Sequence, residues 1–508
     1  MFRAEGGLPF WLPHLFCGMP FLVSLNAHVL YPTELLSLPL GLNAATFFAA
    51  DAILHLWWAG AGAYVLCRTA GRAPAAAFTG GLAFELGQHL FGLTAIGIPW
   101  IRDVSWLPWT FCCLERLRAG GGPTWALAGG VTLGLPVLTA GVQYAAFLWP
   151  VCAVWLLAGH RPDRRRGAAR LAALTAAAAS LSAVLWLPAA EYFHHSVRTS
   201  PELFKVPLAD QASLPAAEWI TFLVPDFFGT HGAYFGPRPF AVSSDYPGLL
   251  TLALAAAGLS AAWRADRRFF WLLAAGALLA AGPRTPPGRL LAGLPLLGSF
   301  RGASRWLMLT QLGLAWFAAR GWERFAAGRR AALGWAVPLA VLAAAFVAGE
   351  HRAGALADGL RDREFVRRHV SWGDAAPGAI APTLAAAFRS AGHAALCGAG
   401  VLALAGTSTV PFVACAAVCW SEIVRDHLTV AGRRTTFAPP RAAYAARPDL
   451  AAFLTAAGRS GSPPRRLLYF ANPVGANRRM SFGVHAVFGY HGLPPTRSVL
   501  KYQLASTA

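Results

Sequence analysis

One carboxylate in this sequence lies where it could do acid–base chemistry, at the edge of an apolar stretch. Asp103 belongs to the sequence PWIRDVSWLPW, residues 99–109. A carboxylate in such a position can act as a general acid or base, or bind a divalent cation. The alternative is a surface ion pair with the neighbouring Arg102, which contributes only about 0–1 kcal/mol. The sequence leaves both interpretations open.

A second candidate chemistry is the binding of phosphate by arginine. Arg301 and Arg305 are four residues apart at the start of an apolar stretch, so a helix places them on one face. One guanidinium group can bind two phosphate oxygens at once, so these side chains could hold a lipid phosphate or a leaving pyrophosphate. The alternative is that they extend to anionic headgroups at a membrane surface.

Two adjacent histidines follow an apolar segment in the sequence PAAEYFHHSVRTSP, residues 188–201. In a helix, Glu191 and His195 share a face, as do His194 and Arg198. Adjacent histidines can titrate, bind a metal or contact phosphate. The ordinary alternative is a solvated helix end.

Ionisable residues also occur inside the apolar segments. Asp51 and His55 are four residues apart in one segment, and Glu85 and His89 repeat that spacing in the next. A charged side chain at the centre of a bilayer costs about 2.5–3.5 kcal/mol on insertion scales, so each pair needs an explanation. Hydrogen bonding between helices is one explanation, and a polar cavity or proton path is the other.

Composition and charge placement indicate the class of protein. The chain has 508 residues, of which 56% are hydrophobic and only 13% charged, whereas soluble domains carry about 25% charged residues. The net charge of +20 lies largely in short turns between apolar stretches, which argues against nucleic acid as a partner. The eight cysteines give no disulfide framework and no ligand set for a metal.

The apolar stretches predict an all-α membrane protein that crosses the bilayer about 11–12 times. The expected helix cores are 46–67, 75–94, 104–117, 123–141, 144–159, 170–188, 247–263, 269–282, 305–320, 331–349, 385–405 and 408–421. The segments 104–117, 269–282 and 408–421 are shorter than the roughly 20 residues that cross a bilayer, so they either tilt or enter without crossing.

The regions of the chain follow from these cores. We expect an outer loop at 1–45, a first transmembrane group at 46–188, an outer loop with candidate site residues at 189–246, a second transmembrane group at 247–421 with outer loops at 283–304 and 350–384, and a tail at 422–508. The tail is basic and contains a predicted strand, Arg466 to Phe470, so we expect a small α/β region on the outer face.

Arginine clusters in alternate turns predict the orientation. They lie at 68–72, 116–118, 161–170, 264–268 and 320–330. Short loops rich in Lys and Arg stay in the cytoplasm, so the remaining loops and the tail face outward across a bacterial cytoplasmic membrane. The chain then begins outside with no preceding span or signal peptide, which suggests that an upstream helix is missing from this sequence.

Several blocks of sequence resemble the bacterial YfhO-type membrane proteins, which are similar to the GT-C class of polytopic glycosyltransferases. These blocks are LPFWLPHLFCGMP, SWLPWTFCCLERL, Gly141-Val142-Gln143, HHSVRTS, LVPDFFGT, DYPGLL, LPLLGSFRGASRWLMLTQLGLAWFAARGWERF and NPVGANRRMSFGVHAVFGYHGLPPTRSVLKY. There are two departures. The acidic residue expected near the family's first helix lies upstream of where this chain starts, and Leu12 stands where the family tends to have Asn.

The resemblance implies a transferase that moves a sugar from a polyprenyl-phosphate donor, held among membrane lipids, to a glycan or lipid acceptor of the cell envelope. Asp103 would then be the acid–base residue, and Arg198, Arg301 and Arg305 would contact phosphate. The cleft would be lined by Glu191, His194, His195, Asp226, Asp245, Tyr246 and Gln143. The resemblance identifies no cofactor with certainty and leaves a divalent cation open. The alternatives are a transporter or flippase that uses Asp51, His55, Glu85 and His89, and a non-catalytic envelope assembly protein.

Overall fold

The computed structural model describes most of the chain up to residue 432 and two short strands beyond it. The described residues are 10–12, 19–23, 28–37, 39–92, 99–139, 141–158, 161–195, 213–230, 234–238, 245–294, 297–300, 302–364, 366–367, 377–406, 412–432, 466–467 and 485–486.

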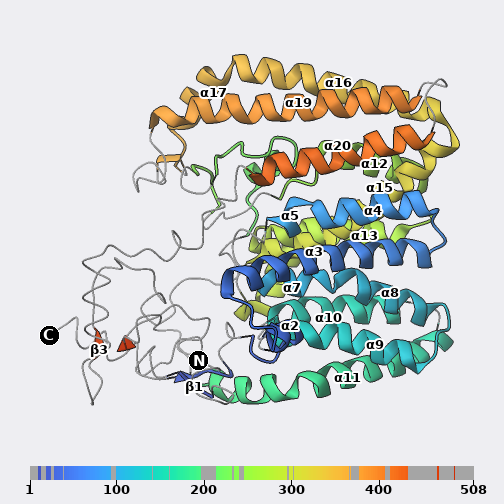
Figure 1. Ribbon diagram of the computed structural model, residues 1–508, viewed down its shortest axis with the longest axis vertical. Helices are drawn as coiled ribbons and strands as arrows, with labels where there is room; N and C mark the ends of the chain where they lie inside the picture. The colour runs from blue at the N-terminus through green and yellow to red at the C-terminus, as the bar shows by residue number, and fades with distance from the viewer. Residues whose placement is uncertain are drawn as a thin grey trace.

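Helices that run side by side form one stack (Figure 1). Each of the twelve expected segments contains a helix, so the helical part of the prediction is confirmed. The longer α-helices are α3 (Ala44–Thr69), α4 (Pro74–Leu86), α8 (Leu107–Arg118), α9 (Pro123–Gly134), α10 (Val142–Leu157), α11 (Arg161–Phe193), α12 (Leu249–Ala262), α13 (Arg267–Ala280), α15 (Leu307–Ala327), α16 (Arg329–His351), α19 (Ile380–Gly406) and α20 (Phe412–Gly432).

Short elements connect these helices at their ends. The α-helices among them are α2 (Pro32–Ser37), α5 (Gln88–Phe91), α7 (Pro99–Ser105), α14 (Pro286–Ala292) and α17 (Ala353–Arg361). The 3-10 helices are η1 (Leu135–Thr139), η4 (Ala216–Phe222), η5 (Gly282–Arg284), η6 (Leu297–Ser299), η7 (Ala303–Trp306) and η8 (Pro377–Ala379).

Strand is scarce in the described residues. An antiparallel pair joins β1 (Trp11–Leu12) to β2 (Met19–Pro20), and a parallel pair joins β3 (Arg466–Leu467) to β4 (His485–Ala486). The strand β3 falls within the predicted Arg466–Phe470 segment. The neighbouring tail residues lie outside the described part of the chain.

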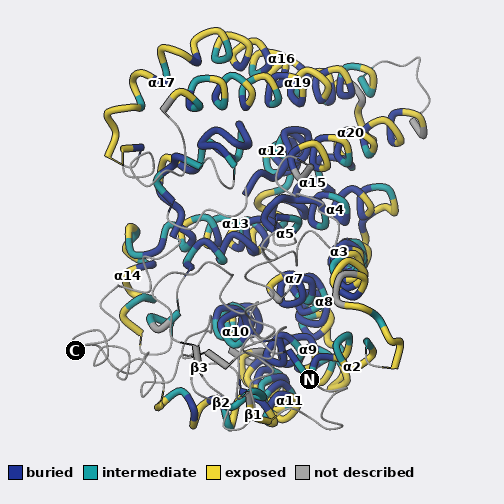
Figure 2. The backbone as a smooth tube through the Cα atoms, turned by 60° about the vertical axis from the view of Figure 1, so that its left-hand side comes forward, coloured by how far each residue is buried: buried dark blue, intermediate teal, exposed yellow. Residues whose placement is uncertain are grey.

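The core is centred on α15. This helix is buried along nearly its whole length, and α4, α12 and α13 pack around it (Figure 2). At the two edges of the stack, α11 and the pair α16 and α19 leave rows of side chains exposed. Three described helices are long and apolar enough to cross a membrane, namely the stretches Arg164–Phe193, Arg330–His351 and Ile380–Gly406.

Two helix boundaries differ from the expected ones. The last helix continues to Gly432, eleven residues past the expected end of its apolar core at 421, because its later turns still bury Ile423, His427 and Val430. Helix α11 begins inside the arginine cluster and ends at Phe193, so Glu191 belongs to the helix.

The turns that carry arginine clusters gather at one end of the stack. We call this the arginine end: it includes the turns after α3, α8, α12 and α15, on the right in Figure 1. Partly buried ion pairs join the turns after α3 and α12 to helix α15, because Asp266 contacts Arg72 at 3.2 Å and Arg320 at 2.5 Å. Glu323 completes the group, at 3.4 Å from Arg72 and 3.3 Å from Arg320. The opposite end holds the candidate site.

Candidate functional site

A break between α4 and α5 determines where His89 lies in the candidate site. The expected helix 75–94 ends at Leu86, and Gly87 adopts ψ 131° before α5 begins. The broken helix leaves the carbonyl of Ala83 without its usual partner, and the side chain Nε2 of Gln311 donates to it at 2.6 Å. A Cβ on residue 87 would lie 1.6 Å from that nitrogen, so only glycine fits beside Gln311.

The break also separates Glu85 from His89. The prediction that they share a helix face is wrong, because the chain changes direction at Gly87. Glu85 stays on α4 and packs against α3, where a Cβ on Gly60 would lie 2.3 Å from its Oε2. His89 turns toward the loop before α12 instead, and its Nδ1 lies 2.8 Å from Oδ1 of Asp245.

Backbone contacts hold this loop beside α5. The backbone N–H of Gln88 donates to the carbonyl of Tyr246 at 2.9 Å, and the side chain of Gln88 donates to the carbonyl of His427 at 3.0 Å. The hydroxyl of Tyr246 donates to Asp426 at 2.7 Å. Tyr246 therefore joins the loop to α20 and does not line the cleft as predicted, whereas Asp245 is placed against His89.

Asp245 is held as a carboxylate by an arginine that the sequence did not single out. Nη1 of Arg238 donates to its Oδ2 at 2.6 Å, and Nη2 of Arg238 donates to Ser304 at 2.8 Å. Burial by itself raises the pKa of Asp245, but the Arg238 charge and the hydrogen bonds outweigh it and lower the pKa to about 2. A feature of the sequence that could have identified Arg238 is its place between two prolines, seven residues before Asp245.

Asp103 lies on α7 and is buried. Gly141 allows this position, because a Cβ there would come within 2.7 Å of the carboxyl carbon. Burial raises the pKa of Asp103 well above its usual range, although the Thr139 hydrogen bond and the Arg305 charge act in the opposite direction. The single hydroxyl hydrogen of Thr139 also faces the carbonyl of Pro136 at 2.7 Å. A protonated Asp103 satisfies both contacts.

Arg305 lies on η7, across from Asp103. Its guanidinium carbon is 3.8 Å from the centre of the Trp100 ring, a cation–π contact. Its Nη1 donates to Oε1 of Gln143, the residue that follows Gly141-Val142 at the start of α10. Trp100 and Gln143 thus hold the guanidinium beside the buried carboxyl group.

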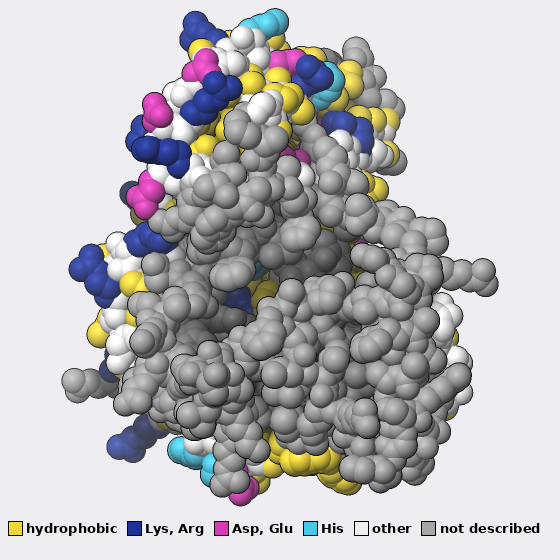
Figure 3. Space-filling model, turned by 90° about the vertical axis from the view of Figure 1, so that its left-hand side faces the viewer, with side chains coloured by type: hydrophobic (Ala, Val, Ile, Leu, Met, Phe, Trp, Pro, Cys, Tyr) yellow, Lys and Arg dark blue, Asp and Glu magenta, His cyan; other side chains and the backbone are white. Residues whose placement is uncertain are grey.

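These residues line one cavity with an empty volume of about 440 Å³, open solvent included. The lining residues are His89, Trp100, Asp103, Val104, Gly141, Gln143, Tyr144, Phe147, Arg305 and Met308. Phe147 also lines a neighbouring pocket that is mostly apolar, formed with Leu279, Leu291, Leu297, Phe300, Trp306 and five small residues. Figure 3 looks at this end of the molecule, and basic, histidine and hydrophobic side chains are visible near its centre.

Arg102 does not pair with Asp103. It lies 1% exposed, its Nε donates to Asp51 at 2.7 Å, and its guanidinium contacts Glu34 at 3.2 Å. The predicted pair of Asp51 and His55 does share a face, because Nδ1 of His55 lies 2.8 Å from the carbonyl of Asp51. These contacts make Asp51 and His55 part of a closed hydrogen-bonded group between α2, α3 and α7.

Tyr31, the residue just before α2, completes the contacts of His55. The hydroxyl of Tyr31 accepts from the indole N–H of Trp106 at 2.9 Å and lies 2.8 Å from Nε2 of His55. Hydrogen bonding between helices, the simpler of the two interpretations, therefore explains Asp51 and His55.

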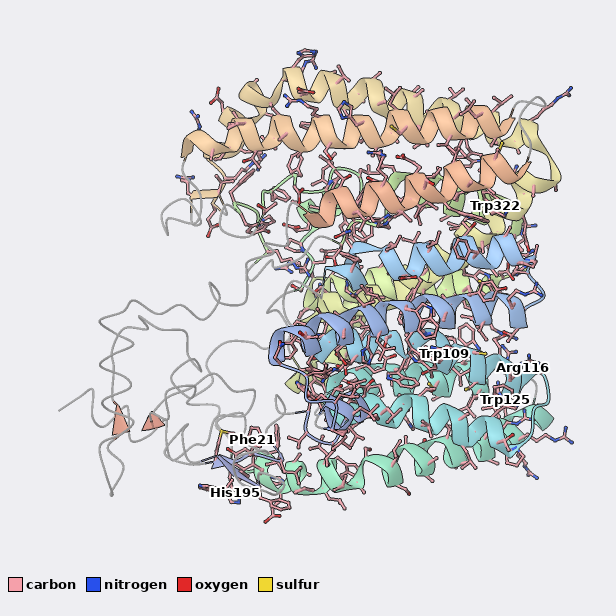
Figure 4. All side chains as sticks on the ribbon, viewed as in Figure 1. Phe21, Trp109, Arg116, Trp125, His195 and Trp322 are labelled. Carbon is pink, nitrogen blue, oxygen red and sulfur yellow. The ribbon has the colours of Figure 1, made fainter. Side chains whose placement is uncertain are left out.

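The remaining predicted residues lie elsewhere. Glu191, His194 and His195 are exposed at the end of α11, where His195 is labelled in Figure 4. Asp226 is buried in a turn with φ +63° and does not line the cavity around Asp103. Arg198 and Arg301 lie outside the described residues. Within the described part of the chain, no three His, Cys, Asp or Glu side chains are grouped so that they could hold a metal ion.

Comparison with known proteins gives no relative from which a function can be taken. No family model matches the sequence, and no curated protein or solved structure matches it significantly.

Proposed function

We propose that this chain is a multi-pass protein of the bacterial cytoplasmic membrane, with the cavity at its outer face. Three helices of membrane-spanning length support this proposal. Large apolar side chains on other helices are also exposed, for example Ile53 at 68%, Val154 at 66% and Trp271 at 64%, and a bilayer would cover them. The arginine end would face the cytoplasm, since short basic turns remain there.

The proposed activity is the transfer of a sugar from a polyprenyl-phosphate donor to a glycan or lipid of the cell envelope. One observation carries this proposal: Arg305 and Asp103 line a single cavity that shares Phe147 with an apolar pocket. A guanidinium suits a phosphate, and the adjacent apolar walls suit a hydrocarbon chain. The likeness to YfhO-type proteins and to the GT-C class points to the same chemistry.

A transporter draws less support. That function would use Asp51, His55, Glu85 and His89 as one polar path. Asp51 and His55 are instead bound to Arg102 and Tyr31, and Glu85 packs against Gly60. No contact among the described residues favours a non-catalytic assembly role.

Transfer of radiolabelled sugar from a panel of polyprenyl-phosphate donors tests the proposal. We expect Arg305→Ala to lower transfer by about 10²–10³-fold, because the departing phosphate loses its positive partner. Arg361→Ala, at an exposed position on α17, is the matched control and should leave transfer unchanged. If Arg305→Ala and Asp103→Asn both transfer sugar at the wild-type rate, the site assignment is wrong.

A further inference from the structure

His89 lines the cavity with one ring nitrogen already bound. Its Nδ1 lies 2.8 Å from Oδ1 of Asp245, and a carboxylate can only accept hydrogen bonds. Nδ1 therefore carries the hydrogen, and a neutral ring then keeps the lone pair on Nε2. His89 is therefore a residue of the wall of the cavity that holds Arg305, and its ring keeps one proton-accepting nitrogen.

Asp245 and Arg238 hold the ring of His89 in this orientation. Asp245 is buried and bonded on its other oxygen to Arg238, at 2.6 Å. Arg238 is in turn fixed by Ser304 and, through its backbone N–H, by the hydroxyl of Tyr234 at 2.8 Å. A carboxylate fixed in this way orients the ring and stabilises the imidazolium that forms when Nε2 gains a proton.

Two titratable groups of the cavity, His89 and Asp103, lie in opposite environments. Asp103 is buried, and its contact with Thr139 is best satisfied when the carboxyl group is protonated. The carboxylate behind His89 is instead paired with an arginine. Such divergent surroundings assign different roles to two groups in one site, and Asp103 is left as a hydrogen-bonding group that holds its own proton.

We propose that His89, oriented by Asp245 and Arg238, is the base that takes the proton from the acceptor hydroxyl; this inference rests on the proposed sugar transfer. The hydroxyl proton moves to Nε2 while the oxygen bonds to the anomeric carbon of the sugar. The bond from that carbon to the phosphate oxygen breaks, and its electron pair leaves with the phosphate beside Arg305. The imidazolium then returns its proton to water.

Full-length purified protein and a simple alcohol acceptor test this role. We expect His89→Gln to lower transfer by about 10²–10⁴-fold while binding of the polyprenyl-phosphate sugar is retained. Addition of imidazole should restore part of the activity of His89→Ala, an effect that a purely structural role would not produce. His351→Gln, at an exposed position at the end of α16, is the matched control.

The outcomes separate the two proposals. If wild-type protein transfers sugar and His89→Gln transfers it equally well, the role of His89 is wrong and the proposed function stands. If the wild type binds no donor and transfers no sugar, the proposed function itself fails. Asp245→Asn alone would leave Arg238 buried without a charge partner, so the double variant Asp245→Asn/Arg238→Gln is the one to measure. Wild-type transfer by a folded double variant would overturn the role of Asp245 as a positioning residue.

Discussion

Two groups of ion-paired side chains lie at opposite ends of the helix stack and use similar residues to different effect. At the arginine end, Arg72 and Arg320 face Asp266 and Glu323, with contacts of 2.5–3.4 Å. Two positive charges meet two negative ones, and Arg72 also lies 4.9 Å from the centre of the Trp316 ring. Every charge in this group is bound by another member, so the group connects turns and presents no reactive atom.

The group at the other end is arranged around one carboxylate. Asp245 lies between Arg238 and His89, and His89 lines a cavity. A neutral histidine with a bound Nδ1 keeps its second nitrogen available. The comparison shows that burial and ion pairing alone do not identify a site; what matters is whether a titratable atom of the group faces a cavity.

The largest expected effect concerns the arginine end. Asp266→Ala would leave Arg72 and Arg320 with one carboxylate between them. Because Arg72 is buried while Asp266, Arg320 and Glu323 are partly exposed, we expect a loss of about 3 kcal/mol, the lower limit for a fully buried pair. We expect thermal unfolding in detergent to shift accordingly, while sugar transfer per folded molecule is unchanged. Asp358→Ala, in an exposed pair with Arg361, should cost less than about 1 kcal/mol. Equal shifts in the two variants would contradict the structural role of Asp266.

The second prediction concerns the pH dependence of stability through Asp103. Its pKa is raised in the folded state by burial, so the folded protein binds the proton more strongly than the unfolded chain. Stability is then lost as the pH rises above the unfolded value, by up to about 1.4 kcal/mol per pH unit. Asp103→Asn mimics the neutral acid and should gain in stability relative to wild type as the pH rises from 4 toward 8. A difference that is constant with pH, measured by thermal unfolding, would contradict this assignment.

The smallest expected effect concerns the helix break. Gly87→Ala brings a Cβ against Gln311 and displaces its bond to Ala83, which we expect to cost about 1–3 kcal/mol. Because the same break places His89, transfer should fall as well. Gly354→Ala, in α17 with no atom near its Cβ, should instead stabilise by about 0.4–1 kcal/mol. Stability and transfer at wild-type levels in Gly87→Ala would show that the break does not position the site.

The sequence predicted the helices well and their contacts poorly. Apolar runs of sufficient length identified all twelve segments, because hydrophobic stretches are a local property of the chain. The break at Gly87 depends on Gln311, which lies 224 residues further along, and the partner of Arg102 is Asp51 rather than its neighbour. Such contacts are decided by packing between helices, which the spacing within one helix cannot show.

The candidate site was predicted only in part. Asp103, Arg305, Gln143 and His89 do line one cavity, but Thr139 and Arg238 were missed. Both act on a neighbouring carboxyl group, and neither residue type stands out in a sequence that contains many threonines and arginines. Their importance comes from the group that each one touches.

In the proposed membrane orientation, the length of helix α11 has a consequence for the N-terminal segment that packs on it. Its 33 residues extend about 50 Å, well beyond the roughly 30 Å of a hydrocarbon core. Near its last turn, Ala189 and Tyr192 pack against Val23 of the N-terminal segment. If the protein spans a bilayer as proposed, α11 holds Val23 at a fixed distance from the arginine end. A thinner or thicker bilayer would then change the depth at which lipid headgroups meet Val23, while the protein itself stayed the same.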